Sequence, residues 1–328
     1  MAEPCLLIGD IGGTNARFAM AHPDQPGFFD ALTLACADYE TAEKGVAAYL
    51  ERSGNNQPDI ICLAAAGPVA DERVCFTNNH WVIDARKLRQ KFPSSSVRLL
   101  NDFEAIACSI PLLGDNDLAA IGLVASGLGG KSEFTLGVLG PGTGLGVAGL
   151  LGRMGGIYPI VGEGGHGGFA PETRMQRKVL RQLLQRHERI SNERLISGPG
   201  LESIYWALCR INGKQDTGIT TAEIFSRVLA NEDVIAVGST QIFYEALGQV
   251  AGNLAMTLGA YDGIYLAGGI VKRYPDLLKN SNFRSGFENK GRHRPLMEKV
   301  PVSLILHPQP GLLGASLYAR ELCRQPLS

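Results

Sequence analysis

The chain has 328 residues, 45% of them hydrophobic and 19% charged, and its 31 basic and 32 acidic side chains leave a formal net charge of −1. This length exceeds the size at which one hydrophobic core keeps growing, so two domains are expected. Because basic and acidic side chains are almost equal in number, the net charge gives no reason to expect a nucleic-acid or membrane partner. Glycine is enriched (41 residues), which indicates many tight turns or close contacts between backbone and ligand.

The seven cysteines are scattered along the chain and form no C-x-x-C pair. This pattern excludes both a disulfide framework and a zinc site. The sequence also shows no charged and apolar leader and no apolar run of about 18 residues. We therefore expect a cytoplasmic protein with reduced thiols.

Apolar periodicity and turn signals predict the secondary structure along the chain. Strands are expected at residues 5–9, 16–21, 59–67, 96–100, 263–270 and 302–307, with a strand, turn and strand over 134–151. Helices are expected at residues 40–54, from 102 or 103 onward, and at 173–188, 198–211, 220–231, 235–258 and 311–324. Strands that alternate with helices predict an α/β fold.

One glycine-rich hairpin occurs twice. "DIGGTNARFAM" (residues 10–20) and "GPGTGLGVAGL" (residues 140–150) align when Thr14 is placed on Thr143, and an apolar run precedes each. Backbone N–H groups in such a turn form an anion-sized concavity, and glycine lets a ligand approach closely. For either hairpin alone, a plain tight turn is an equally good interpretation. Together, the two favour a clamp on the phosphates of one nucleotide.

The two copies of the hairpin differ in charge. Asp10 aligns with Leu139, so only the first copy carries a carboxylate that could hold Mg²⁺ through water. A third glycine element, Gly268-Gly269, lies at the end of the apolar strand expected over residues 263–270. A nucleotide base could lie flat against the backbone there.

These motifs resemble those of a known superfamily. Asp10-Ile-Gly-Gly-Thr-Asn-Ala-Arg, the second Gly-Thr-Gly turn and Leu-Ala-Gly-Gly-Ile resemble the phosphate-1, phosphate-2 and adenosine motifs of the actin/hexokinase/Hsp70 ATPases. More narrowly, the chain is similar to bacterial glucokinases of the non-zinc group. "LNDFEAIA", "GEGGHGGFAP", "ERLISGPGLESIY" and "PGLLGASLY" follow the order of that family. Related sugar kinases with a cysteine-rich zinc motif are disfavoured, because the chain has no such cluster.

The resemblance implies two ribonuclease-H-like α/β lobes with an active-site cleft between them. The small lobe would comprise residues 1–112 and 308–328, and the large lobe residues 113–307. It further implies ATP and Mg²⁺ as cofactors and a homodimer as the usual assembly. The expected nucleotide contacts are Asp10, Gly12, Gly13, Thr14, Asn15, Arg17, Gly142, Thr143, Gly144, Gly268 and Gly269.

A hexose is a ring of hydroxyls, and selective binding requires several carboxylates and amides. Asn101 and Asp102 stand where a strand gives way to a helix, a position that also suits a plain N-cap. The resemblance makes Asp102 the base that takes the proton from the sugar 6-hydroxyl, and it assigns Asn101 to sugar binding. Phosphoryl transfer depends mostly on positioning and charge neutralisation, so one carboxylate and Mg²⁺ suffice.

Three further stretches supply candidate sugar ligands. Glu163 and His166 lie among five glycines, which disfavours a helix and a metal pair and favours a mobile loop that closes over sugar. Glu193 matches a sugar-binding glutamate of the family, although it could instead be a helix residue paired with Arg194. Asn78 is a candidate beside the same site, with Asn79 or His80 as alternatives. The turn at residues 198–200 fits either the nucleotide site or a plain helix start.

The predicted function is ATP-dependent phosphorylation of D-glucose at O6. The first alternative is a kinase of another hexose, such as fructose, mannose or an amino sugar, on the same fold. The second is a non-enzymatic actin-like ATPase, which would have no need of the carboxylate cluster. ADP or polyphosphate as phosphoryl donor also stays open.

Overall fold

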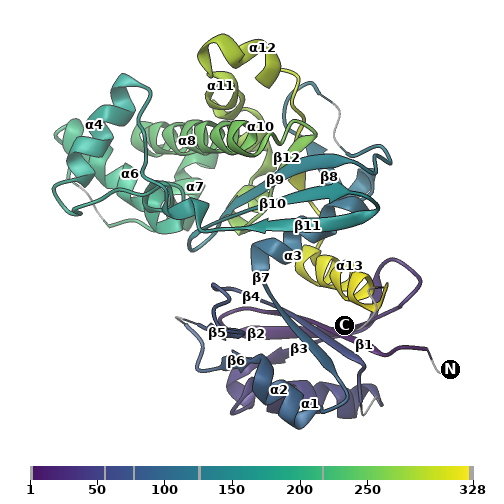
Figure 1. The fold of residues 1–328 in the computed structure, drawn as a ribbon. Coiled ribbons are helices and arrows are strands. Elements are labelled where there is room, and N and C mark those ends of the chain that lie inside the picture. The colour runs from purple at the N-terminus through teal and green to yellow at the C-terminus, as the bar shows by residue number, and fades with distance from the viewer. Residues whose placement is uncertain (1–2, 55–56, 77, 125–126, 216–217, 325–328) are drawn as a thin grey trace. The chain divides into compact units, whose positions relative to one another are not determined.

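A computed structural model describes residues 3–54, 57–76, 78–124, 127–215 and 218–324 of the chain. These fold into two compact units (Figure 1). The first consists of Met1–Gly114, Leu150–Val161 and His307–Ser328, and the second of Asp115–Gly149 and Gly162–Leu306. Residues 113–307 were expected to form one lobe. Residues 150–161 instead join the first unit, where strand β11 (Gly156–Val161) packs on helix α3 (Asp102–Ser109).

The first unit is built on a five-stranded sheet in the order β3-β2-β1-β4-β7. β1 is antiparallel to β2 and parallel to β4, and β4 is parallel to β7. The bounds of its strands are β1 Leu6–Ile11, β2 Asn15–Ala21, β3 Phe28–Ala35, β4 Ile60–Ala65 and β7 Ser96–Asn101. Its helices are α1 Ala42–Ser53, α2 Ala85–Lys91, α3 Asp102–Ser109 and α13 Pro310–Arg324.

Both faces of this sheet are buried at β1, which explains the apolar run at the start of that strand. Leu7 and Ile11 belong to a cluster that includes residues of α1 and α2. Leu6 and Ile8, on the opposite face, belong to a cluster with residues of α3 and α13. Helix α13, drawn in yellow in Figure 1, therefore covers β1 although it lies 300 residues away in the sequence.

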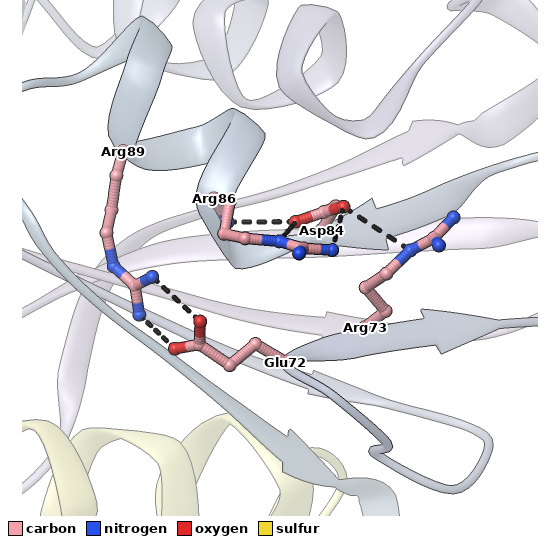
Figure 2. Close-up of polar contacts among 5 residues, drawn as sticks. All are labelled: Glu72, Arg73, Asp84, Arg86 and Arg89. Carbon is pink, nitrogen blue, oxygen red and sulfur yellow. Dashed lines mark hydrogen bonds and ion pairs between the residues drawn. The ribbon is translucent and has the colours of Figure 1, made fainter.

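A small two-stranded sheet, β5 (Arg73–Cys75) and β6 (Val82–Asp84), leads into α2. Figure 2 shows how two carboxylates hold it to the helix. The Asp84 side chain is the N-cap of α2 and lies 3.2 Å from Nη2 of Arg86 and 3.3 Å from Nε of Arg73. Burial raises the pKa of Asp84, but the hydrogen bonds and charges of these arginines outweigh it, so this pKa lies below its ordinary value. Glu72 pairs with Arg89 in the same way. These ion pairs anchor both ends of the segment that carries Asn78.

A second sheet has the order β11-β10-β9-β12-β13-β8, so β10, β9, β12 and β13 occupy the places that β2, β1, β4 and β7 occupy in the first. β12 is parallel to both β9 and β13. The bounds are β8 Leu118–Ala120, β9 Phe134–Pro141, β10 Leu145–Arg153, β12 Gly263–Leu266 and β13 Val302–Ile305. The repeated hairpin in the sequence thus corresponds to a repeated sheet.

The strand expected over residues 263–270 is shorter in the structure, because β12 ends at Leu266. Gly268 has a φ of +96°, a conformation that interrupts the strand, and α9 begins at Gly269. The helix expected over residues 173–188 likewise ends at Leu183. In the turns that follow, Gln185 N and Arg186 N donate to the carbonyl oxygens three residues back, at Gln182 and Leu183.

Helices α5, α6, α7 and α11 pack on α8, a long helix with an Asp233 N-cap and a left-handed Gly259 at its end. Aromatic and aliphatic side chains from α6, α7, α8 and α11 form the core of the second unit. The helix bounds are α4 Arg174–Leu183, α5 Asn192–Leu195, α6 Gly198–Ile211, α7 Thr221–Ala230, α8 Val234–Leu258, α9 Gly269–Arg273, α10 Pro275–Lys279, α11 Phe283–Glu288 and α12 Arg294–Met297.

Candidate active site

The first glycine hairpin joins β1 to β2 as expected. Asp10 is the penultimate residue of β1 and stands opposite Arg17 of β2, with 3.7 Å between Oδ2 and Nη1. Burial raises the pKa of Asp10, and the charge of Arg17 opposes this shift. The turn closes through a hydrogen bond from Gly12 N to Asn15 O of 2.9 Å. Gly13, Thr14 and Asn15, at the tip of this turn, are exposed.

The N-terminus of α13 lies against the Asp10 carboxylate. A Cβ built on Gly311 would lie 2.9 Å from both Cγ and Oδ2 of Asp10. The positive end of the helix dipole favours a negative charge at this place. Gly311 therefore leaves room for the carboxylate, a role not predicted from the sequence. The signal was present in "PGLLGASLY", whose proline and glycine mark a helix start.

In the segment after β5, the two alternatives to Asn78 make hydrogen bonds within the protein. Asn79 donates from Nδ2 to Gly12 O (3.0 Å), and its Oδ1 accepts from Trp81 N (3.0 Å). His80 Nε2 lies 2.9 Å from Tyr39 O. Both side chains hold the segment in place, whereas Asn78 is exposed and its carbonyl oxygen faces Gly13. Asn78 remains the candidate ligand in this segment.

Asn101 and Asp102 stand at the junction of β7 and α3, as predicted. Asn101 is the N-cap, because its Oδ1 accepts from Phe103 N (2.9 Å), and Glu104 completes a capping box. Its Nδ2 donates to Gly67 O at the end of the neighbouring β4 (3.0 Å). Asp102 is the first residue of the helix and is partly buried. Asn101 therefore caps α3, and this cap holds Asp102, the next residue, at a defined position.

In the second unit the structure brings together three residues that are separate in the sequence. His166 Nε2 lies 4.0 Å from Glu163 Oε2 and 3.9 Å from Glu193 Oε1. The glycine-rich loop forms only one 3-10 turn, Gly164–His166, instead of an α-helix. The loop is tied to the first residue of α5 by a hydrogen bond from Asn192 N to Gly167 O (2.8 Å). Two carboxylates and an imidazole converge here, a donor and acceptor set suited to sugar hydroxyls.

Glu193 belongs to the short helix α5, and its carboxylate is directed away from the helix. Oε2 accepts a hydrogen bond from Leu145 N (2.9 Å), while Oε1 faces His166. Among the described residues, the Glu193 carboxylate therefore contacts Leu145 N and His166 and is not paired with Arg194, the alternative partner in the sequence. Leu145 follows the Gly-Thr-Gly turn directly, so Glu193 connects the second hairpin to the sugar candidates.

The second hairpin closes differently from the first. Gly142 N donates to Gly144 O (2.8 Å), whereas the donor in the first hairpin is Gly12 N. The donor of the second hairpin therefore lies one residue later than the position aligned with Gly12. The residue aligned with Gly12 is Pro141, which has no N–H to donate. Gly198, in the first turn of α6, donates to Gly142 O (2.9 Å). The Gly-Pro-Gly turn thus both starts a helix and supports the second glycine turn.

Gly268 lies close to the end of β9. A Cβ built on it would lie 2.5 Å from Pro141 O, and its φ of +96° also favours glycine. At Gly269 a Cβ would meet no atom within 4 Å. The two adjacent glycines therefore differ: one allows backbone contact inside the unit, and the other leaves open space.

Comparison with known proteins decides the family. The family model Glucokinase matches residues 7–322. The glucokinase of Marinobacter nauticus is 42% identical over 315 residues, which cover 96% of this chain and 97% of that protein. The chain belongs to the glucokinase family. The predicted resemblance and the prediction of an enzyme are both confirmed.

Solved structures confirm the fold. A glucokinase from an Antarctic psychrotroph superimposes with a TM-score of 0.89 at 30% identity, covering 98% of this chain and 100% of that one. A glucokinase of the ROK family from Streptomyces griseus, in complex with glucose and AMPPNP, gives a TM-score of 0.62 at 20% identity, over 97% and 99% of the two chains. At 20% identity, this similarity supports the fold and carries no conclusion about function. Within the described residues, no helix has the length and apolar character needed to cross a membrane.

Proposed function

We propose that this chain transfers the γ-phosphoryl group of ATP to O6 of D-glucose, with Asp102 as the general base. The observation that carries the proposal is the convergence of Glu163, His166 and Glu193 beside the second glycine hairpin. These side chains would bind sugar hydroxyls together with Asn101 and Asn78. Asp102, held at the start of α3, would accept the proton from the 6-hydroxyl as that oxygen attacks phosphorus.

Both hairpins would contribute groups that hold the phosphates of the nucleotide. Backbone N–H groups and the threonine hydroxyls are donors suited to phosphate oxygens. Gly268-Gly269 would lie against adenosine. The predicted contacts are Asp10, Gly12, Gly13, Thr14, Asn15, Arg17, Gly142, Thr143, Gly144, Gly268 and Gly269. Closure of the units around sugar would exclude water, which competes as phosphoryl acceptor.

Asp10 would hold Mg²⁺ through water. Mg²⁺ keeps several waters and takes one or two carboxylates along with substrate phosphates, and a single partly buried carboxylate beside the turn fits this donor set. When bound with ATP, Mg²⁺ neutralises the charge that develops on the phosphates. Arg17, which faces Asp10, would orient the carboxylate for this purpose.

Sugar-dependent ADP release tests the substrate. We expect kcat/KM with glucose to exceed kcat/KM with fructose, mannose or N-acetylglucosamine by at least about tenfold. A site that hydrogen-bonds each hydroxyl rejects analogues in which one hydroxyl is misplaced. The four sugars should be measured in parallel with ATP and Mg²⁺. A preference for another hexose would assign the chain to the alternative sugar kinases.

We also propose a cytoplasmic homodimer. All seven cysteines lie in the described part of the chain without a disulfide, as reducing conditions favour. Strand β11 is the edge of its sheet and exposes Tyr158 (53%), Ile160 (40%) and Val161 (54%). An exposed apolar edge strand is suited to pairing with a second copy.

Sedimentation velocity tests this assembly. We expect Ile160→Lys to shift the protein from dimer to monomer, because it places a charge in the proposed contact. Leu229→Lys, a matched change at an exposed position of α7 (64%), should leave the dimer intact. A dimer that persists in Ile160→Lys, or a parent protein that is monomeric, contradicts the role of β11.

A further inference from the structure

The Glu193 carboxylate lies directly over the turn of the second glycine hairpin. Its Oε2 accepts from Leu145 N at 2.9 Å, and its Oε1 lies 3.9 Å from His166 Nε2. A carboxylate that accepts a backbone N–H is held more firmly than a neutral acceptor would be. One side chain thus contacts both the hairpin assigned to phosphate and the cluster assigned to sugar.

Gly144 makes room for this carboxylate. The three atoms nearest to a Cβ built on Gly144 all belong to Glu193, namely Oε2 at 2.5 Å, Cδ at 3.2 Å and Cγ at 3.9 Å. The backbone of Gly144 is outside the left-handed region, since its φ is not among the positive values. Its conformation is therefore open to other residues, and what requires glycine here is the neighbouring carboxylate.

Gly142, two residues earlier in the same turn, has different surroundings. A Cβ built on it would meet no atom within 4 Å, and its φ is likewise not positive. Two glycines of one motif thus face different partners. Gly142 faces open space, as a glycine that contacts a ligand would, whereas Gly144 faces a protein side chain.

We propose that Gly144 is a positioning residue of the sugar site: its missing side chain lets the Glu193 carboxylate bond Leu145 N and face His166. The inference rests on the proposed role of Glu193 as a glucose ligand. An added methyl group would meet the end of a flexible side chain, so the carboxylate moves and the backbone stays. The loss falls on sugar binding, although Gly144 belongs to a phosphate motif.

Isothermal titration with glucose in the absence of nucleotide measures this directly. Gly144→Ala should raise the glucose Kd by about tenfold or more, the typical cost of misplacing a charged hydrogen-bond partner. Gly142→Ala is the matched control within the same turn, and its glucose Kd should stay within about twofold of the parent. Thermal unfolding of both variants reports whether the fold is retained.

A double-mutant cycle identifies the side chain through which Gly144 acts. Glu193→Asp shortens the side chain by one methylene and withdraws the carboxylate from the added methyl group. Glu193→Asp alone should weaken glucose binding. In that background, Gly144→Ala should change the glucose Kd by less than about twofold, so the two effects are not additive.

The outcomes separate the inference from the function on which it rests. If Glu193→Asp weakens glucose binding but Gly144→Ala does not, the positioning role of Gly144 is overturned and the sugar role of Glu193 stands. If Glu193→Asp leaves the glucose Kd unchanged, the proposed sugar site itself fails. If Gly144→Ala unfolds the protein and Glu193→Asp does not restore it, the methyl group meets something other than Glu193, and the inference is wrong.

Discussion

Asp102→Asn is expected to lower turnover by about a hundredfold to ten-thousandfold while glucose binding stays nearly intact. The amide has the shape of the carboxylate but cannot accept the proton of the 6-hydroxyl at neutral pH. Helix α3 should be unaffected, because its N-cap is Asn101. The glucose Kd by titration and the rate of ADP formation at saturating substrates are the two measurements needed.

Asp71→Asn is the matched control for this change. Asp71 is exposed in the turn before β5, with a φ of 50°, a conformation that asparagine tolerates well. It should retain the turnover of the parent. If Asp102→Asn kept more than a tenth of the parent rate, Asp102 would not be the base. ATP hydrolysis that is unchanged and independent of sugar would favour an actin-like ATPase without sugar-kinase activity.

Asp10→Ala is expected to lower turnover by at least about a hundredfold, because it removes the only carboxylate of the two hairpins. The aligned residue of the second hairpin, Leu139, offers no replacement. The glucose Kd, measured without nucleotide, should stay close to that of the parent. Turnover at increasing Mg²⁺ concentration is the decisive measurement, and near-normal activity at saturating Mg²⁺ would contradict the role of Asp10.

Gly311→Ala is a milder test of the same carboxylate. The added methyl group would displace Asp10 without removing its charge. We expect a higher Mg²⁺ concentration for half-maximal turnover and a smaller loss of maximal rate than in Asp10→Ala. An unchanged Mg²⁺ requirement would show that the position of the carboxylate at α13 does not matter.

The sequence by itself determined the types of the elements, the duplication and most of the candidate residues. Period-2 and period-3.6 patterns and turn residues are local signals, and they predicted β1, β2, α8 and α13 with bounds close to those observed. The two glycine hairpins aligned through their shared glycine and threonine positions, although the turns close through different hydrogen bonds. The glycines around Glu163 and His166 correctly argued against an α-helix.

Only the tertiary structure decided which side chains meet. Nothing in the local pattern places Glu193 on Leu145, His166 within 4.0 Å of two carboxylates, or Gly311 against Asp10. Such contacts depend on strand order and on helices that return to a sheet from distant parts of the chain. The early end of β12 has the same origin, because Gly268 turns where it meets Pro141 of β9. Apolar periodicity marks which face of an element is buried but not which distant segment covers it, so the contacts of the site depend on the tertiary fold.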